Sequence, residues 1–441
     1  MALSFKFKFA RISWRDAWAT LIPVALLVVL ALWITLKFVQ PAPPDTIIIA
    51  SGPEGSSFAS FAQRYQKILA RQGVKLRIVP SEGSLDNLKR LADPKHAVDI
   101  GFVAGGLAGQ VEGSAELDSL GSIFYAPVYV FYRAPKPLQR LSALEGRRIA
   151  LGREGSGTHV LAAALLRANG VDEKNSKFVE LDGKAAADAL LKKEVDAAFL
   201  AGDSAAFATI RDLIRTDGIR LFDFNQGEAY VKRFRYLTRL DLPPGTLDLG
   251  KNLPPETLTL LAPTVELVAR ESLHPALSDM LIEAAREVHG RSTLFQKAGE
   301  FPAPLEHEYR ISDDAQRYYK SGKTFAYRHF PFWVASLIDR IVVVVVPLMV
   351  ILIPAFNIVP RLYRWRVIQR VYRRYAELMA LERAAFNDPD RKERAELLRR
   401  LDKLEEAVIK LRLPGSFADQ VYLLRNHIGF VRARLSQASA Q

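Results

Sequence analysis

The chain has 441 residues, a formal net charge of +13 at pH 7 and no cysteine. This length favours two or three domains. The lack of cysteine excludes a disulfide framework, a thiolate zinc site and a cysteine nucleophile. The basic excess lies at the two ends, where residues 1–16 carry +3 and residues 361–441 carry +8. Because hydrophobic segments adjoin both ends, a membrane explains this bias better than a nucleic-acid partner does.

A first hydrophobic run, Ala17–Leu36, contains no charged residue. It matches the roughly 20 apolar residues that cross a bilayer, and Trp18 and Trp33 lie near its ends as interfacial aromatic residues do. A cleaved signal peptide is the alternative, but the run is long for one and no A-x-A-like site follows. We therefore predict an uncleaved transmembrane helix over 17–39, preceded by a cytoplasmic segment, 1–16.

A second charge-free run, Ile341–Pro360, is followed at once by a cluster of arginines. A buried core helix is the alternative, but no neighbouring segment could cover it. We predict a second transmembrane helix over 338–360. By the positive-inside rule both termini then lie in the cytoplasm, at a bacterial inner (plasma) membrane, and the segment between the spans lies in the periplasm.

The segment between the spans alternates short apolar strands with amphipathic helices, which predicts an α/β domain over 45–330 with a mainly parallel sheet. A segment of this size normally divides into two lobes. We place lobe I at about 45–127 and 265–320 and lobe II at about 134–255. The predicted strands are 46–50, 75–79, 98–103, 128–132, 148–151, 178–181, 197–200 and 258–270, and the predicted helices are 58–71, 85–92, 158–169, 185–193 and 275–289. The chain would pass between the lobes twice, near Val128–Arg133 and Leu258–Arg270, and these two connections would form the hinge.

The stretch Leu144–Val171 combines a short strand, the glycine-rich turn Gly152–Gly157 and a helix that begins near Thr158. The free backbone N–H groups at a helix N-terminus carry partial positive charge and bind anions. The turn matches neither the dinucleotide-binding nor the P-loop pattern. The stretch therefore predicts an anion site, and a well-capped turn without a ligand is the alternative of about equal weight.

Four pieces of the chain together resemble the TAXI-type solute-binding proteins of TRAP transporters: IIIASGPEGSSF, PSEGSLDNLKRLADPKHAVDIGFVAGG, LEGRRIALGREGSGT and AAADALLKKEVDAAFLAGD. The resemblance implies a two-lobed type II periplasmic-binding fold, a small organic acid as ligand and TRAP membrane subunits as partners. Carried over position by position, the ligand contacts that it implies are Ser56, Ser57, Gly83, Ser84, Ser156, Gly157, Thr158, Gly202 and Asp203.

Several of these positions have a second interpretation. Arg153 could meet a ligand carboxylate or be a solvated loop residue. Asp203 could pair with a ligand amine or cap the helix that follows it. His159, which could suggest an enzyme, fits better as a residue at the cleft rim, because no nucleophile elbow is present. No histidine pair has metal-ligand spacing, so we predict neither metal nor cofactor, and no enzymatic activity.

The tail contains two apolar seams with alternating spacings of four and three residues, one from Leu397 to Leu411 and one from Phe417 to Leu435. A break at Leu413–Ser416 separates them. We predict a cytoplasmic helical hairpin over 361–441 that either folds alone, self-associates or docks on a cytoplasmic partner. The function expected from the whole chain is capture of an anionic solute for TRAP-type transport. The alternative is a sensor or scaffold that reports ligand binding through the tail.

Overall fold

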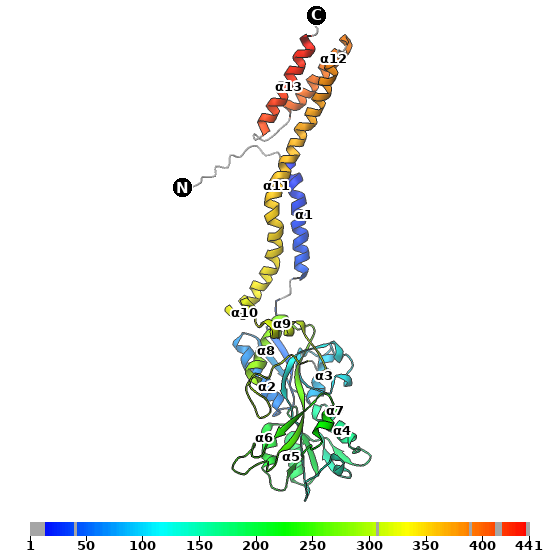
Figure 1. Ribbon diagram of the computed structural model, residues 1–441, viewed down its shortest axis with the longest axis vertical. Coiled ribbons are helices and arrows are strands. Elements are labelled where there is room, and N and C mark those ends of the chain that lie inside the picture. Colours follow the sequence, from blue (N-terminus) through cyan, green and yellow to red (C-terminus); the bar gives the residue numbers. More distant parts are fainter. Residues whose placement is uncertain (1–13, 39–41, 306–307, 388–389, 411–416, 438–441) are drawn as a thin grey trace, which may run out of the picture. The chain divides into compact units, whose positions relative to one another are not determined.

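The computed structural model describes residues 14–38, 42–305, 308–387, 390–410 and 417–437 (Figure 1). They belong to two compact units, residues 42–337 and the two ends of the chain, and each is described by itself. Residues 1–13 of the predicted cytoplasmic segment, Leu411 and the predicted break Leu413–Ser416 lie outside the described residues.

The unit 42–337 contains two β-sheets. The first has the order β12 (Arg310–Ile311), β4 (Leu117–Tyr125), β11 (Leu258–Arg270), β3 (Ile100–Ala104), β1 (Thr46–Ala50) and β2 (Lys75–Val79), with β10 (Leu237–Leu242) also paired to β11. The second has the order β7 (Lys177–Val179), β6 (Arg148–Ala150), β8 (Ala197–Leu200), β5 (Tyr129–Tyr132) and β9 (Arg220–Leu221).

Both sheets are mixed, so the prediction of a mainly parallel sheet was wrong. The βα units make parallel pairs, such as β1 with β2 and β6 with β8. Five antiparallel pairs break this pattern. The strand β11 pairs antiparallel with β3, β4 and β10, and β5 pairs antiparallel with β8 and β9. All of these except the pair of β10 with β11 join distant parts of the chain, and the alternation of strands and helices does not reveal them.

Each sheet has its own helices. The first is accompanied by α2 (Ser57–Arg71), α3 (Ser84–Ala92), α8 (Pro275–His289), α9 (Asp313–Ser321) and α10 (Phe325–His329). The second is accompanied by α4 (Gly157–Ala168), α5 (Gly183–Leu191), α6 (Phe207–Ile214) and α7 (Gly227–Arg233). Short 3₁₀ turns lie at Ala108–Gln110, Ser114–Glu116 and Leu141–Leu144.

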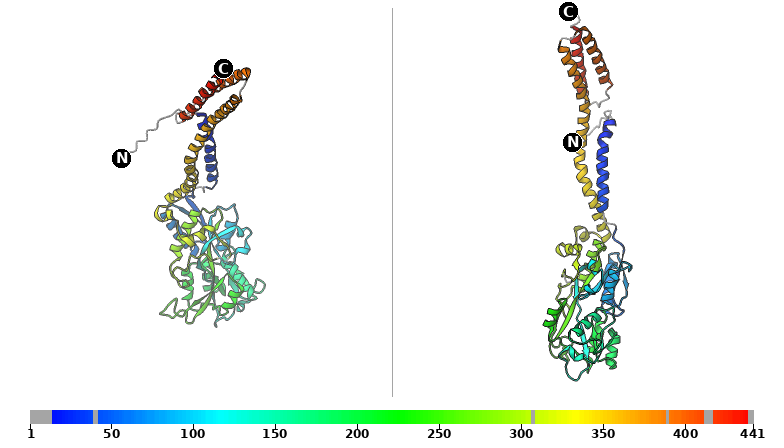
Figure 2. Two further views of the ribbon diagram at one scale, coloured as in Figure 1. Left: turned by 45° about the horizontal axis from the view of Figure 1, so that its top comes forward. Right: turned by 90° about the vertical axis from the view of Figure 1, so that its right-hand side faces the viewer.

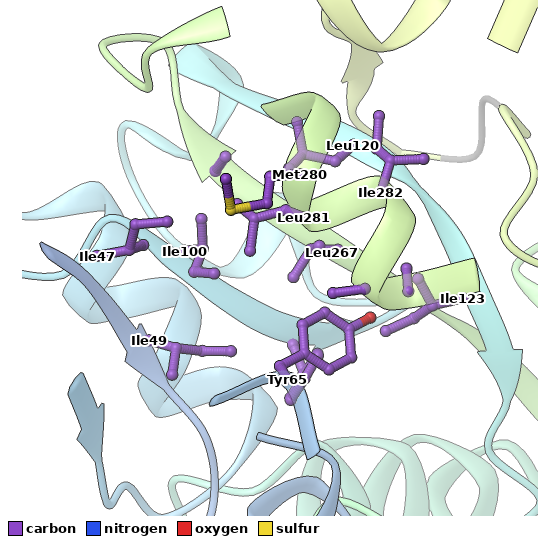
Figure 3. Packing of buried hydrophobic residues seen from close by; sticks show 14 of the residues in the cluster. Ile47, Ile49, Tyr65, Ile100, Leu120, Ile123, Leu267, Met280, Leu281 and Ile282 are labelled. Atoms are coloured by element: carbon purple, nitrogen blue, oxygen red, sulfur yellow. The ribbon is translucent and has the colours of Figure 1, made fainter. Parts of the chain in front are cut away.

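Separate hydrophobic cores define two lobes. In lobe I, side chains from the first sheet and from α8 point toward one another with Tyr65 of α2 among them (Figure 3). Lobe II has cores on both faces of the second sheet. The long strand β11 joins them, because residues 258–263 pair with β10 in lobe II and residues 264–270 pair with β3 and β4 in lobe I. A second connection runs from β4 to β5, next to the bridge between Val128 and Leu261.

The second unit is helical. It contains α1 (Trp14–Phe38), α11 (Phe332–Phe386, which begins in the first unit), α12 (Arg391–Ile409) and α13 (Ala418–Gln437). Among the described residues, α11 is the one helix that is long and apolar enough to cross a membrane by length and composition, and the apolar stretch Leu21–Lys37 of α1 is shorter. Many apolar side chains on both helices are exposed.

The tail contains three packed helices where two were predicted. The helix α11 continues past Pro360 to Phe386, and its last turns pack against α12 and α13, which lie side by side (Figure 2). The predicted seams supply most of the core of this bundle, and α11 adds two residues. The buried residues are Val371 and Leu378 from α11 and Leu401, Leu404, Val408, Leu424, Ile428, Val431 and Leu435 from the seams. The seams are therefore covered within the chain.

Candidate functional site

The predicted loops of both lobes come together at the N-terminus of α4. Three serines hold the loops in place. Ser56 caps α2 by accepting the Ala59 N–H at 3.1 Å, and Ser156 caps α4 by accepting the His159 N–H at 3.1 Å. Ser84, the first residue of α3, accepts the Ala104 N–H at 3.2 Å. All three serines are buried, so each fixes a helix start close to where the lobes meet.

Asp203 occupies the predicted anion position at α4. Its Oδ2 accepts the Gly157 N–H at 2.6 Å and the Thr158 N–H at 3.2 Å, and its Oδ1 accepts the Thr158 hydroxyl. Asp203 is 2% exposed. A carboxylate at this point satisfies two of the free N–H groups of the helix and interacts favourably with its dipole. Asp203 thus caps α4, whereas α6, the helix that follows it, has Ala206 at its N-cap and no side-chain cap hydrogen bond.

Lobe I reaches the same point through glycines. A Cβ placed on Gly83 would lie 3.1 Å from the Ser156 Cα and 3.1 Å from the Asp203 Oδ2, and Gly83 has a φ of +128°. A Cβ on Gly157 would lie 2.9 Å from the Ser84 Cβ. The two loops can approach this closely because glycine has no side chain at either position. The two lobes are therefore in direct contact at these loops, which we call the lobe seam (residues 52–57, 82–86, 153–158 and 202–205).

Backbone hydrogen bonds cross the lobe seam at two further places. The Asp86 N–H donates to the Gly155 carbonyl at 2.9 Å. The Ser57 N–H and hydroxyl both donate to the Ala205 carbonyl, at 3.3 Å and 3.2 Å. Gly202 faces the same serine, since a Cβ there would lie 3.6 Å from the Ser57 Cβ.

Arg153 makes ion pairs on both sides of the seam. Its guanidinium lies 2.9 Å from Glu82 of lobe I and 3.3 Å from Asp182 of lobe II, and its side chain is half exposed. Burial raises the pKa of Asp182, and the charge of Arg153 acts in the opposite direction. The half-exposed pair with Glu82 contributes about 0–1 kcal/mol. Arg153 thus belongs to an ion-pair network at the exposed edge of the lobe seam.

The structure does not pair His159 with Ser156 as base and nucleophile. The His159 ring Nδ1 lies 3.1 Å from the Gly152 carbonyl, and the Ser156 hydroxyl donates to the Arg153 carbonyl at 2.7 Å. In the described part of the chain, no group of three His, Asp or Glu side chains could hold a metal ion.

Two buried polar residues near the site were not predicted. Asn87 donates to the carbonyls of Ser51 and Phe102, at 2.7 Å and 2.9 Å, and so ties α3 to the first sheet. Glu266 lies in the middle of β11 and is 1% exposed. Burial raises its pKa to about 7. The only signal in the sequence is one carboxylate within an otherwise apolar strand.

The lobes, their mixed sheets and the loops between them define a periplasmic-binding-like α/β fold. A family model described as the NMT1-like family matches residues 49–273, more than half of the chain. The chain therefore belongs to the NMT1-like family.

Three solved structures illustrate the likeness to periplasmic binding proteins. They are the aliphatic sulphonate binding protein SsuA from Escherichia coli (16% identity, 56% of this chain and 69% of that chain, TM-score 0.34), SsuA from Xanthomonas axonopodis pv. citri bound to MOPS (16%, 56% and 74%, 0.37), and an ancestral arginine-binding protein bound to arginine (14%, 57% and 95%, 0.36). Likeness at this level says nothing about which ligand this chain takes.

Proposed function

We propose that this chain is an extracytoplasmic binding protein that captures a small anionic organic solute between its lobes, as a TAXI-type component of a TRAP transporter. One observation carries the proposal: at the N-terminus of α4, two backbone N–H groups and the Thr158 hydroxyl hold a carboxylate in a buried place where loops of both lobes meet. The proposed contact residues are those predicted: Ser56, Ser57, Gly83, Ser84, Arg153, Ser156, Gly157, Thr158, Gly202 and Asp203.

The proposal includes two membrane spans, 17–39 and 338–360, with both termini in the cytoplasm and 45–330 in the periplasm. Exposed apolar side chains on α1 and along the first half of α11 support it, since such surfaces need lipid or protein to cover them. The arginines from Arg361 onward support the orientation.

An impermeant thiol reagent tests this topology in intact cells, because the chain has no cysteine of its own. Cysteines are introduced at Ala115 and Ser436, which are both exposed; Ser114 beside the first is buried and unsuitable. We expect labelling at position 115 only. Labelling at position 436 would refute the orientation.

The sensor or scaffold function remains the second candidate, and one feature favours it. The bundle at the end of α11 is continuous with the proposed second span, so any movement of that span would reach the bundle directly. A TRAP component should co-purify with large multi-span membrane subunits, whereas a sensor should co-purify with a cytoplasmic protein that is lost when residues 391–441 are removed.

The solute itself is tested by native mass spectrometry of the purified full chain, followed by calorimetry with the molecule that is released. Thr158→Val is then compared with threonine in an Asp203→Gly chain, where the hydroxyl no longer donates to the Asp203 carboxylate. It removes one donor at the carboxylate position without changing the size of the side chain. We expect the affinity for the solute to fall by roughly 1.5–3 kcal/mol, as for other hydrogen bonds to charged groups. An unchanged affinity would place the solute away from α4.

A further inference from the structure

We infer that lobe I docks on the periplasmic face of the membrane through exposed apolar residues of α10 and the start of α11. These residues form the docking surface: Phe325, Phe330, Trp333, Val334 and Leu337. The inference rests on the proposed second span, because that span brings the surface to the bilayer. It goes further by giving a folded lobe a lipid-binding role, with lobe II left in the aqueous phase.

The side chains of the docking surface are apolar and open to solvent. Phe325 is 75% exposed, Phe330 45% and Trp333 38%. All five residues of the surface lie within thirteen positions of the chain, from 325 to 337. Single exposed apolar residues are common, whereas a group of them marks an interaction with protein or membrane. Phenylalanine and tryptophan beside basic residues are typical of segments that lie at the boundary between lipid and water.

The segment that carries these residues is fastened to lobe I. Ala326 and Phe332 are buried, and Phe332 belongs to the core of lobe I with Tyr327 packed against it. A Cβ on Gly73, in the turn after α2, would lie 3.0 Å from the indole nitrogen of Trp333. Buried and exposed residues thus follow one another along the segment. The exposed rings therefore belong to the surface of lobe I and not to a loose linker.

The charges around the docking surface are basic. Residues 320–338 contain Lys320, Lys323 and Arg328 and no acidic residue. Lys323 pairs with Glu283 of α8 at 2.6 Å, whereas Lys320 and Arg328 are exposed. Basic side chains close to a bilayer are attracted to anionic headgroups. A bilayer that contains anionic lipid therefore matches both the apolar and the basic side chains of this segment.

The length of chain before the proposed span brings the docking surface to the headgroups. The helix α11 is continuous from Phe332 onward, and the proposed span begins at 338. Trp333 precedes that residue by five positions, which is about 8 Å along the helix, and a tilt of the helix brings it closer. The headgroup layer on each side of the hydrocarbon is about 5–8 Å thick. Trp333 therefore lies within this layer or at its outer edge.

The docking surface has a consequence for movement between the lobes. All of its residues belong to the unit that contains the lobes, and their buried neighbours pack in the core of lobe I. Lobe I would thus be held at the bilayer, and opening of the lobe seam would move lobe II relative to the membrane.

The experiment measures how deep single positions lie in lipid, with the full chain in vesicles of phosphatidylcholine and phosphatidylglycerol in equal amounts. One spin label is attached in turn to a cysteine that replaces Thr324, Ala208 or Val345. Thr324 precedes Phe325, and Ala208 follows Phe207, a half-exposed residue of lobe II; both labelled positions are exposed. Val345 lies in the proposed span. Collisions of the label with oxygen, which concentrates in lipid, and with a water-soluble nickel complex report its depth.

At position 324 we expect a collision rate with the nickel complex that is at most about half of the rate at position 208, and a higher rate with oxygen. Position 345 should be reached by oxygen only. When Phe325→Ser and Phe330→Ser are combined, the nickel complex should reach position 324 as readily as position 208. Phe207→Ser is the matched control and should leave position 324 unchanged. Unchanged signals at 208 and 345 in the double variant show that the lobes and the span are intact.

The three labelled positions separate failure of docking from failure of the proposed span. If position 345 lies in lipid and position 324 behaves like position 208, the span stands and docking is overturned. If both reagents are excluded from position 324, protein covers it, and docking on lipid is again overturned. If the nickel complex reaches 345 while 324 lies in lipid, the span fails and docking stands. Solute capture is measured separately by calorimetry, because the labels lie outside the lobe seam.

Discussion

Different kinds of contact hold the two lobes together at the lobe seam and the three helices together in the tail bundle (the last turns of α11 with α12 and α13). At the seam, the contacts between the lobes are made by glycine backbone, backbone hydrogen bonds and the hydroxyl of Ser57. In the bundle, a continuous row of leucine, isoleucine and valine is buried, and ion pairs such as Arg432 with Asp402 and Glu405 lie outside it. Polar contacts can be exchanged for contacts with water or a solute at little net change, whereas buried apolar surface cannot. The contacts at the lobe seam can therefore break and form again, whereas the three helices of the bundle should stay packed together.

The largest effect is expected from placing a charge in the bundle core. Leu424 is fully buried among α11, α12 and α13, and Leu424→Asp combines loss of packing with burial of a carboxylate, which together cost about 3–5 kcal/mol or more. Hydrogen exchange should show loss of protection in α12 and α13, with the lobes unaffected. Tyr422→Asp, two residues away and exposed, is the control; equal protection in the two variants would contradict the packing.

A pH-dependent effect is expected in the lobes. The pKa of Glu266 is about 7 in the folded chain, against an ordinary value of 4.5. The folded state holds this proton more tightly, so its contribution to stability is complete below pH 4.5 and is lost as the pH rises to about 7, a loss of about 3 kcal/mol.

Other groups titrate in the same range, so the prediction concerns the difference between parent and Glu266→Gln. Thermal unfolding of the lobes should lose stability over pH 4.5–7 less steeply in Glu266→Gln than in the parent. Glu271→Gln, just beyond the same strand and exposed, should match the parent. Parallel pH profiles for parent and Glu266→Gln would show that Glu266 ionises normally.

Gly83→Ala should hold the seam open. The added methyl would meet the Ser156 Cα at 3.1 Å, and a φ of +128° is strained for any residue with a Cβ, at a cost of about 1–3 kcal/mol. Spin labels on cysteines that replace the exposed Lys95 of lobe I and Lys174 of lobe II should move apart. Gly109→Ala, where a Cβ would meet nothing within 4 Å, should leave the distance unchanged; a short distance in both variants would count against close contact.

The smallest effect is expected from Ser156, and it distinguishes a role as the cap of α4 from a role in holding the lobes together. Ser156→Ala removes the cap of α4 and should lower the stability of lobe II by about 1 kcal/mol. It leaves the donors to Asp203 in place, so the distance between the labels should not change. A wider distance at normal stability would mean that the Ser156 side chain holds the lobes together and is not mainly a helix cap.

The sequence predicts the strands that carry the site more accurately than the sheets that contain them. The strands at 46–50, 75–79, 197–200 and 258–270 have the predicted bounds. The strand β4 was missed, because its serines and Gly121 interrupt the apolar pattern. The partner of Asp203 was missed for another reason: it lies 45 residues earlier in the chain, and only the folded sheet brings the two loops together. The third helix of the bundle was missed because the prediction ended a membrane span at Pro360.

The helix α11 has mechanical properties that follow from its prolines. A continuous helix of 55 residues is about 80 Å long at the usual rise per residue. Pro347, Pro354 and Pro360 each remove one hydrogen bond from the ladder. The spacing of seven residues places the first two gaps on nearly the same side of the helix, whereas Pro360, six residues further on, places its gap on another side. Bending of α11 is therefore expected at these three places and is not confined to one plane.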